Sequence, residues 1–171
     1  MITAEFARTM ARYNTWQNQS LFQSANRLDE TARRLDRGAF FGSIHGTLSH
    51  LFWGDSIWMS RFDGWEKPPV GIPESPQWVN DWQDLSDRRQ RADADILRWA
   101  DQLTDEELGG HLSWYSGALK ADVSKPLALC VAHFFNHQTH HRGQVHALLT
   151  AAGESPDDTD LFVMPAWAEN A

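Results

Sequence analysis

Apolar side chains recur along the first 28 residues at the spacing of a helix with one buried face. They follow one another at intervals of three to five positions, a period typical of an amphipathic helix. These positions are Phe6, Met10, Tyr13, Trp16 and Leu21. We therefore predict a first helix from Thr3 to about Leu28. The polar stretch from Asp29 to Gly38 then links it to the next element.

A second helical stripe begins near Ser43, whose hydroxyl suits an N-cap, and is predicted to run to about Phe62. Its apolar members are Ile44, Leu48, Leu51, Trp58 and Phe62. From Asp63 to Pro76 the chain then holds four prolines and two glycines. These are too many backbone breakers for a regular element, so we predict a long crossover loop.

Helical spacing returns after this loop and predicts a third helix that starts near Trp78 and ends near Leu103. Its apolar stripe consists of Trp78, Trp82, Leu85, Ala92, Ile96, Trp99 and Leu103. We expect four charged residues of this segment on its solvent side. They are Arg88, Arg89, Arg91 and Asp95.

The pattern changes between Gly109 and Ser124, where polar and apolar residues alternate loosely on both sides of Gly117. We expect a short hairpin there, with a plain loop as the alternative. A last helix is predicted from Leu127 to Ala151, with Pro126 at its first position and Gly153 as its stop. The tail, residues 154–171, contains Leu161, Phe162, Val163, Met164 and Trp167. These side chains are expected to pack back onto the helices or onto a partner.

Length and composition favour one domain over residues 1–171, and the predicted helices make its fold all-α apart from the possible hairpin. A net charge of −8 without a basic block excludes a nucleic-acid-binding surface. No stretch approaches the roughly 20 apolar residues that span a bilayer, so we expect no membrane segment and a cytoplasmic location. The single cysteine, Cys130, excludes an internal disulfide and is expected to pack in the core.

Histidines gather in the last predicted helix, where five of the eight lie between His133 and His146. Residues four apart turn by only about 40° around a helix, so His133, His137 and His141 share one face. Two imidazoles at this spacing can reach one divalent ion, and a further ligand can come from His45 or His50 of the second helix. The alternative is that these rings bond only to carbonyls and carboxylates. That alternative is favoured for His140, which lies about 100° away from His141.

Two strings resemble the paired signature of the DinB-like family. The first is Asn136-His137-Gln138-Thr139-His140-His141-Arg142-Gly143-Gln144, and the second is His50-Leu51-Phe52-Trp53-Gly54-Asp55-Ser56-Ile57-Trp58. The Tyr13-Asn14-x-Trp16 start is also similar. The resemblance covers nearly the whole chain and implies a four-helix bundle that binds one metal ion. By position, the implied ligands are His50, His137 and His141.

Three neutral imidazoles would leave the ion its full double charge and an open position for water or a thiol. Zinc is the first choice of metal, and nickel, iron or copper would also suit these ligands. Asp55 is interpreted as an orienting carboxylate or, more commonly, a surface residue. Arg142 is expected to bind an anionic group or to be solvated. We expect His133 in the pocket wall, and Trp53 and Trp58 in the core.

Relatives in the resembled family include bacillithiol transferases and mycothiol-dependent maleylpyruvate isomerases, while many members have no known reaction. The leading hypothesis is therefore a metal-dependent enzyme that joins a small electrophile to a low-molecular-weight thiol or to water. A non-catalytic protein that binds or senses a metal or small ligand is the alternative. The apolar tail further predicts a homodimer, and a dimeric interaction protein is a third hypothesis.

Overall fold

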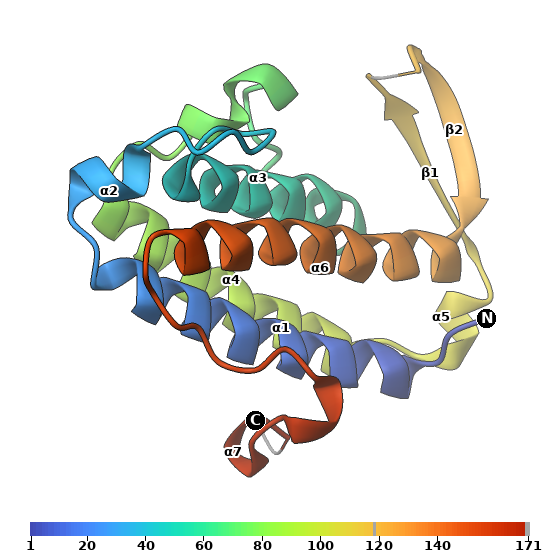
Figure 1. Cartoon of the computed structure of the whole chain (residues 1–171). Coiled ribbons are helices and arrows are strands. Elements are labelled where there is room, and N and C mark those ends of the chain that lie inside the picture. The colour runs from blue at the N-terminus through green and yellow to red at the C-terminus, as the bar shows by residue number, and fades with distance from the viewer. Residues whose placement is uncertain (118, 170–171) are drawn as a thin grey trace.

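The computed structural model describes residues 1–117 and 119–169 and is mostly helical (Figure 1). Its four long helices are α1 (Ala4–Asn26), α3 (Ile44–Phe62), α4 (Trp82–Gln102) and α6 (Leu127–Ala151). α1 packs along α4 and α6, and α3 packs along α6 and also touches α4. No helix among the described residues is long and apolar enough to cross a membrane.

Local capping explains where the long helices begin. The hydroxyls of Thr3 and Ser43 accept hydrogen bonds from backbone N–H groups of α1 and α3, respectively. These two helices lie where the sequence predicts them, and so does α6, which has no side-chain cap. The third helix starts later than predicted, at Trp82 instead of Trp78, because the carboxylate of Asp81 caps it by accepting from the Asp84 N–H at 2.8 Å.

Three short helices occupy the connections. α2 (Glu30–Arg34) lies within the predicted polar linker, and α5 (Asp105–Leu108) follows α4. The crossover loop contains a 3₁₀ helix, η1 (Ile72–Gln77), although its prolines argued against any regular element. A proline is tolerated in the first turn of a helix because its missing N–H has no partner to lose there, and Pro73 lies in that turn.

The predicted hairpin is present, and a plain loop is excluded. β1 (His111–Ser116) pairs with β2 (Ala121–Pro126) in an antiparallel register that sets Trp114 opposite Val123. The hairpin projects beyond the helices (Figure 1). Pro126 ends β2 and occupies the N-cap of α6, so it stands one position before the first helical residue predicted for it.

The tail returns along α1. The Tyr13 hydroxyl donates to the Thr159 carbonyl at 2.6 Å, and the Gln17 amide donates to the Asp158 carbonyl at 2.8 Å. After η2 (Leu161–Val163), the short helix α7 (Ala166–Glu169) buries Ala168 against Tyr13 and Trp16. Phe162 and Trp167 nevertheless stay exposed. Residues 170 and 171, which end the predicted tail, lie outside the described residues.

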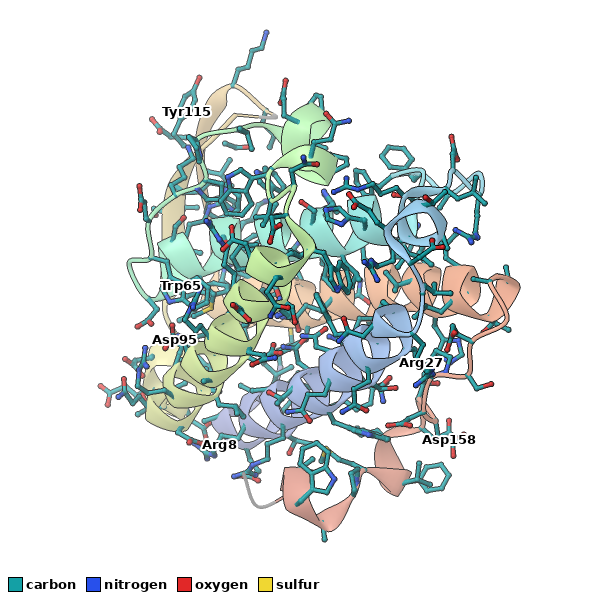
Figure 2. All side chains as sticks on the ribbon, turned by 90° about the vertical axis from the view of Figure 1, so that its left-hand side faces the viewer. Arg8, Arg27, Trp65, Asp95, Tyr115 and Asp158 are labelled. Carbon is teal, nitrogen blue, oxygen red and sulfur yellow. The ribbon has the colours of Figure 1, made fainter. Side chains whose placement is uncertain are left out.

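Besides the small cluster of Tyr13, Trp16 and Ala168, the core contains two large apolar clusters and a buried polar layer. One cluster includes Ile96, Trp99, Phe134 and Phe135, and the other includes Leu21, Ile44, Leu48 and Leu149. All four long helices supply the polar layer. Its members are Asn14, Asn18, Asp55, Arg89, Asp93, Gln138 and Arg142. By contrast, residues such as Arg8 and Asp95 project outward (Figure 2).

Ion pairs and amide hydrogen bonds hold the polar layer together. The Arg89 guanidinium, only 2% exposed, lies 2.6 Å from a carboxylate oxygen of Asp55 and 2.8 Å from one of Asp93. Gln138 donates to Asp55, while Arg142 donates to Asn14. Burial raises the pKa of Asp93 to about 6 although Arg89 opposes the shift, and burial lowers the pKa of Arg142 to about 10.

Three sequence-based expectations are therefore wrong. Arg89 is not on the solvent side of its helix, Asp55 is not a surface residue, and Arg142 is neither solvated nor free to bind an anion. In each case the reason is the same. A charged side chain can be buried when groups on other helices pair with it, and sequence periodicity along one helix does not reveal those partners.

Candidate metal centre

The three predicted ligands come together between α3 and α6. One ring nitrogen from each of His50, His137 and His141 lies within 4.8 Å of the others, a grouping that could hold a metal ion. His137 and His141 stand on successive turns of α6, with ring centroids 4.4 Å apart. His50 approaches from α3, with its ring centroid 4.7 Å from that of His141. His50 and His141 are buried, and His137 is half-buried.

Hydrogen bonds determine which ring nitrogen of His50 carries the proton. His50 Nδ1 lies 2.7 Å from Ser75 Oγ, and that hydroxyl donates its own hydrogen to the Ile72 carbonyl at 2.7 Å. Because the hydroxyl has only one hydrogen, Ser75 accepts from His50 Nδ1. Nε2 of His50 is therefore left with a free lone pair, which is the state that a metal ligand requires.

The same reasoning applies to His141. Its Nδ1 lies 2.8 Å from the side-chain oxygen of Gln144, which can only accept. The amide nitrogen of Gln144 meanwhile lies 3.3 Å from His140 Nε2, which agrees with this orientation of the amide. His141 therefore carries its proton on Nδ1 and has its lone pair on Nε2.

His137 is held by packing against Gly54 of α3. A Cβ atom on Gly54 would lie 2.6 Å from His137 Cε1, so the ring occupies the space that any larger residue would fill. His137 Nδ1 is buried and has no hydrogen-bond partner among the described groups. An imidazole whose nitrogen lacks a protein partner fits a metal site, because a bound ion and its ligands supply the missing interaction.

All three rings are kept neutral. Burial, followed by the neighbouring imidazoles, lowers the pKa of His50 and of His137 to about 3. Burial likewise lowers the pKa of His141, although its hydrogen bond to Gln144 opposes the shift. Only the neutral imidazole binds a metal, so these environments prepare the rings for that role at neutral pH.

The donor set fits an open divalent metal site. Ligand atoms around a tetrahedral zinc with bonds of about 2.1 Å lie roughly 3.4 Å apart. The ring nitrogens lie within 4.8 Å of one another, so each pair would have to approach by at most about 1.4 Å to reach this spacing. Three histidines are also the protein ligands of open, catalytic zinc sites, whereas closed structural sites use four.

A pocket of about 420 Å³ opens over the three rings. Phe41 stacks on His50 with centroids 3.7 Å apart, and Trp53 stacks less closely at 5.5 Å. Phe40, Ile72 and Gln144 complete part of its wall. Trp53 is therefore a wall of this pocket and not a core residue as predicted. Trp58 is only half-buried, and it lies over α6 beside His133, with ring centroids 5.0 Å apart.

The other candidate residues stay outside the ligand set. His45 donates to the Val79 carbonyl at 2.9 Å, and exposed His140 bonds to Gln144, as expected for a residue off the ligand face. His133 is exposed and does not line the pocket, contrary to the expectation that it forms a wall. Cys130 is buried, as predicted, and burial raises the pKa of its thiol.

Sequence reasoning missed the groups that orient the ligands. Asp55 was the candidate for this role, but its hydrogen bonds go to Arg89 and Gln138. Ser75 and Gln144 bond to the ligand rings instead. Gln144 carries a recognisable signal, since it lies three residues after His141 on one helix. Ser75 carries none, because the crossover segment that contains η1 brings it to His50 from 25 residues away.

Comparison with known proteins shows the family of the chain. The DinB family model matches residues 1–171. The chain is 28% identical over 177 residues to Protein DinB of Bacillus subtilis (strain 168), covering 98% of this chain and 99% of the relative. It also shares its fold with the crystal structure of a DinB-like protein from Bacillus cereus ATCC 10987. That likeness has a TM-score of 0.58 at 17% identity, over 84% of this chain and 91% of the other. The chain belongs to the DinB family.

Proposed function

We propose that the protein is a metal-dependent enzyme related to the thiol S-transferases, with one divalent ion bound by His50, His137 and His141. The observation that carries the proposal is the convergence of three neutral imidazoles at the floor of an open pocket. A bound ion would act as a Lewis acid and lower the pKa of a thiol or water at its open position. Zinc is the proposed metal.

The residues around the ligands support chemistry at the ion. Ser75 and Gln144 hold two rings in the tautomer that presents Nε2, so these ligands need no rearrangement of their protons. None of the described residues that line the pocket carries a carboxylate. The positive charge of the ion is therefore not neutralised by the protein and remains available to stabilise a thiolate or hydroxide.

We propose that the whole chain forms a single domain with the four-helix bundle of the family. Its substrate is proposed to be a small molecule, since the pocket volume of about 420 Å³ is in the range of small-molecule sites. The proposed compartment is the cytoplasm, because a lone buried thiol is compatible with reducing conditions.

The second candidate function is a non-catalytic protein that binds or senses a metal or a small ligand. One observation favours it. Among the described residues that line the pocket, none is Asp, Glu, Lys or Arg, so no carboxylate is present as a general base and no cation as a substrate anchor. If the protein were an enzyme, the groups available for catalysis in this lining would be the ion and the exposed His140.

Cobalt substitution separates the two functions. A small thiol added to the cobalt protein is expected to bind the open position and to produce a sulfur-to-metal charge-transfer band. The apparent affinity should rise with pH as the thiolate fraction grows. The His50→Ala variant should lose both tight metal binding and the band. If no thiol changes the spectrum of the wild-type cobalt protein, and the spectrum shows a fourth protein ligand, the transferase proposal fails. The non-catalytic binding function is then favoured.

A further inference from the structure

Apolar side chains form much of the wall of the metal pocket. Its large apolar members are Phe40, Phe41, Trp53 and Ile72. Its hydrogen-bonding members beyond the three predicted ligands are His140 and Gln144, and both belong to α6. The described part of this lining contains no Asp, Glu, Lys or Arg. Among the described residues of the lining, a charged group would thus find no Asp, Glu, Lys or Arg as an ion-pair partner, and only the metal would offset its charge.

The flat part of this wall is firmly held. Phe41 and Trp53 are both nearly parallel to the His50 ring, at interplanar angles of 21° and 24°. The indole nitrogen of Trp53 donates to the Val70 carbonyl at 2.9 Å, which fixes the orientation of the ring. These aromatic faces beside a metal ligand are suited to contact a flat, uncharged group.

Two large apolar side chains remain exposed at the mouth of the pocket. Phe40 is 82% exposed and touches Phe41 edge-on, with ring centroids 4.8 Å apart. It stands in a tight turn in which Gly38 and Gly42 both have positive φ, 76° and 75°. Ile72, from η1, is also exposed. Exposed apolar groups that border a pocket offer apolar surface that a bound ligand can cover.

We infer that the molecule bound at the metal carries an uncharged apolar group, preferably aromatic, which lies against Phe40, Trp53 and Ile72. A heteroatom of the same molecule binds the ion. The polar edge formed by His140 and Gln144 leaves room for one hydrogen-bonding substituent. A substrate or thiol with carboxylates next to its metal-binding atom is disfavoured. This inference rests on the proposed metal site and deepens it, because it specifies the class of ligand.

Hydroxamates test the inference without relying on thiol chemistry, since they bind an open metal position through oxygen. The cobalt protein is titrated with acetohydroxamate, benzohydroxamate and a succinic acid monohydroxamate that keeps a free carboxylate. Benzohydroxamate should bind about tenfold more tightly than acetohydroxamate, because one favourable aromatic contact raises affinity by about this factor. The carboxylate-bearing compound should bind no more tightly than acetohydroxamate.

Variants then locate the contact. Phe40→Ser should remove most of the difference in affinity between benzohydroxamate and acetohydroxamate. Its affinity for acetohydroxamate should equal that of the wild type. Phe162→Ser is the matched control, because Phe162 is 85% exposed and lies in η2, outside the pocket lining. Equal affinities for all three hydroxamates, or an unchanged preference in Phe40→Ser, would overturn the inference. Failure of every thiol to produce a charge-transfer band, with the hydroxamate order preserved, would instead overturn the transferase proposal alone.

Discussion

Replacing Gly54 by alanine should separate the stability of the fold from the binding of metal. Gly54 lies inside α3, one turn after His50, and faces His137. An added Cβ would stand 2.6 Å from His137 Cε1, whereas ordinary contacts begin at 3.4 Å. The imidazole must therefore retreat by about 0.8 Å, the difference between these distances. Because the obstacle is the end of a side chain, the ring moves and the helices need not.

Gly54→Ala should maintain or raise the stability of the metal-free protein and lower its affinity for zinc. Alanine is preferred over glycine within a helix by about 1 kcal/mol, so the metal-free protein should unfold at an equal or higher urea concentration. Metal–ligand distances tolerate only about 0.2 Å, so a ring displaced by several times that amount no longer binds the ion well. We expect zinc affinity to fall at least about 100-fold, equivalent to about 2.7 kcal/mol.

Chelator competition measures the zinc affinity, and urea denaturation of the metal-free protein measures its stability. Gly143→Ala is the control, because Gly143 lies in α6 and no atom stands within 4 Å of the Cβ that would be added. This variant should gain the same helical stability and keep its zinc affinity. If Gly54→Ala bound zinc as tightly as the wild type, the reasoning about His137 would be refuted.

Three further predictions follow from the core, the ligand rings and the surface. Arg89→Met should destabilise the protein by about 3–5 kcal/mol, because it leaves two buried carboxylates unpaired. Arg88→Ala breaks only an exposed pair and should change stability by less than about 1 kcal/mol in the same urea titration. The lowered pKa values of His50 and His137, about 3, mean that the unfolded chain binds more protons below pH 6.5. The unfolding free energy of the metal-free protein should therefore fall on acidification from pH 7 towards 4, by up to about 1.4 kcal/mol per pH unit for each ring. If the unfolding free energy of a His137→Gln variant fell with pH as steeply as that of the wild type, this prediction would be contradicted. Finally, the exposed apolar side chains of the tail between Leu161 and Trp167 favour a homodimer, which light scattering should detect and which a 19.5 kDa species at high micromolar concentration would refute.

The helices were predictable because their signals are local. Apolar periodicity and side-chain caps lie within a few residues of the ends they determine, as at Thr3 and Ser43. The hairpin was predictable from loose alternation around Gly117. The late start of α4 was not predicted, because Trp78 fits the apolar spacing of the helix although it precedes the Asp81 cap. The 3₁₀ helix η1 was not predicted, because prolines indicate a break and yet are tolerated in a first turn.

The ligand set depended on two kinds of information. Helical spacing alone placed His133, His137 and His141 on one face and left two histidines of the second helix open. Only the resemblance to the DinB-like family selected His50. Structurally, His45 is excluded because its Nε2 bonds to a carbonyl, while His50 is five residues further along the helix and meets the rings of α6.

The buried polar layer could not be predicted from one sequence. Arg89 and Asp55 lie 34 residues apart, and their pairing depends on how α3 and α4 pack. The pocket wall has the same origin, since Phe41 reaches His50 from a loop and Trp53 turns away from the core. Contacts between elements decide these features, and periodicity reports only which face of an element is apolar.

The most direct test of the metal centre is the zinc content of purified variants after equilibration with excess zinc and removal of the unbound ion. The wild type and His140→Ala should each retain one zinc per chain. His50→Ala, His137→Ala and His141→Ala should each retain far less than one, since two imidazoles hold the ion poorly. Full retention by any of these three variants, or loss of zinc in His140→Ala, would contradict the assignment of the site.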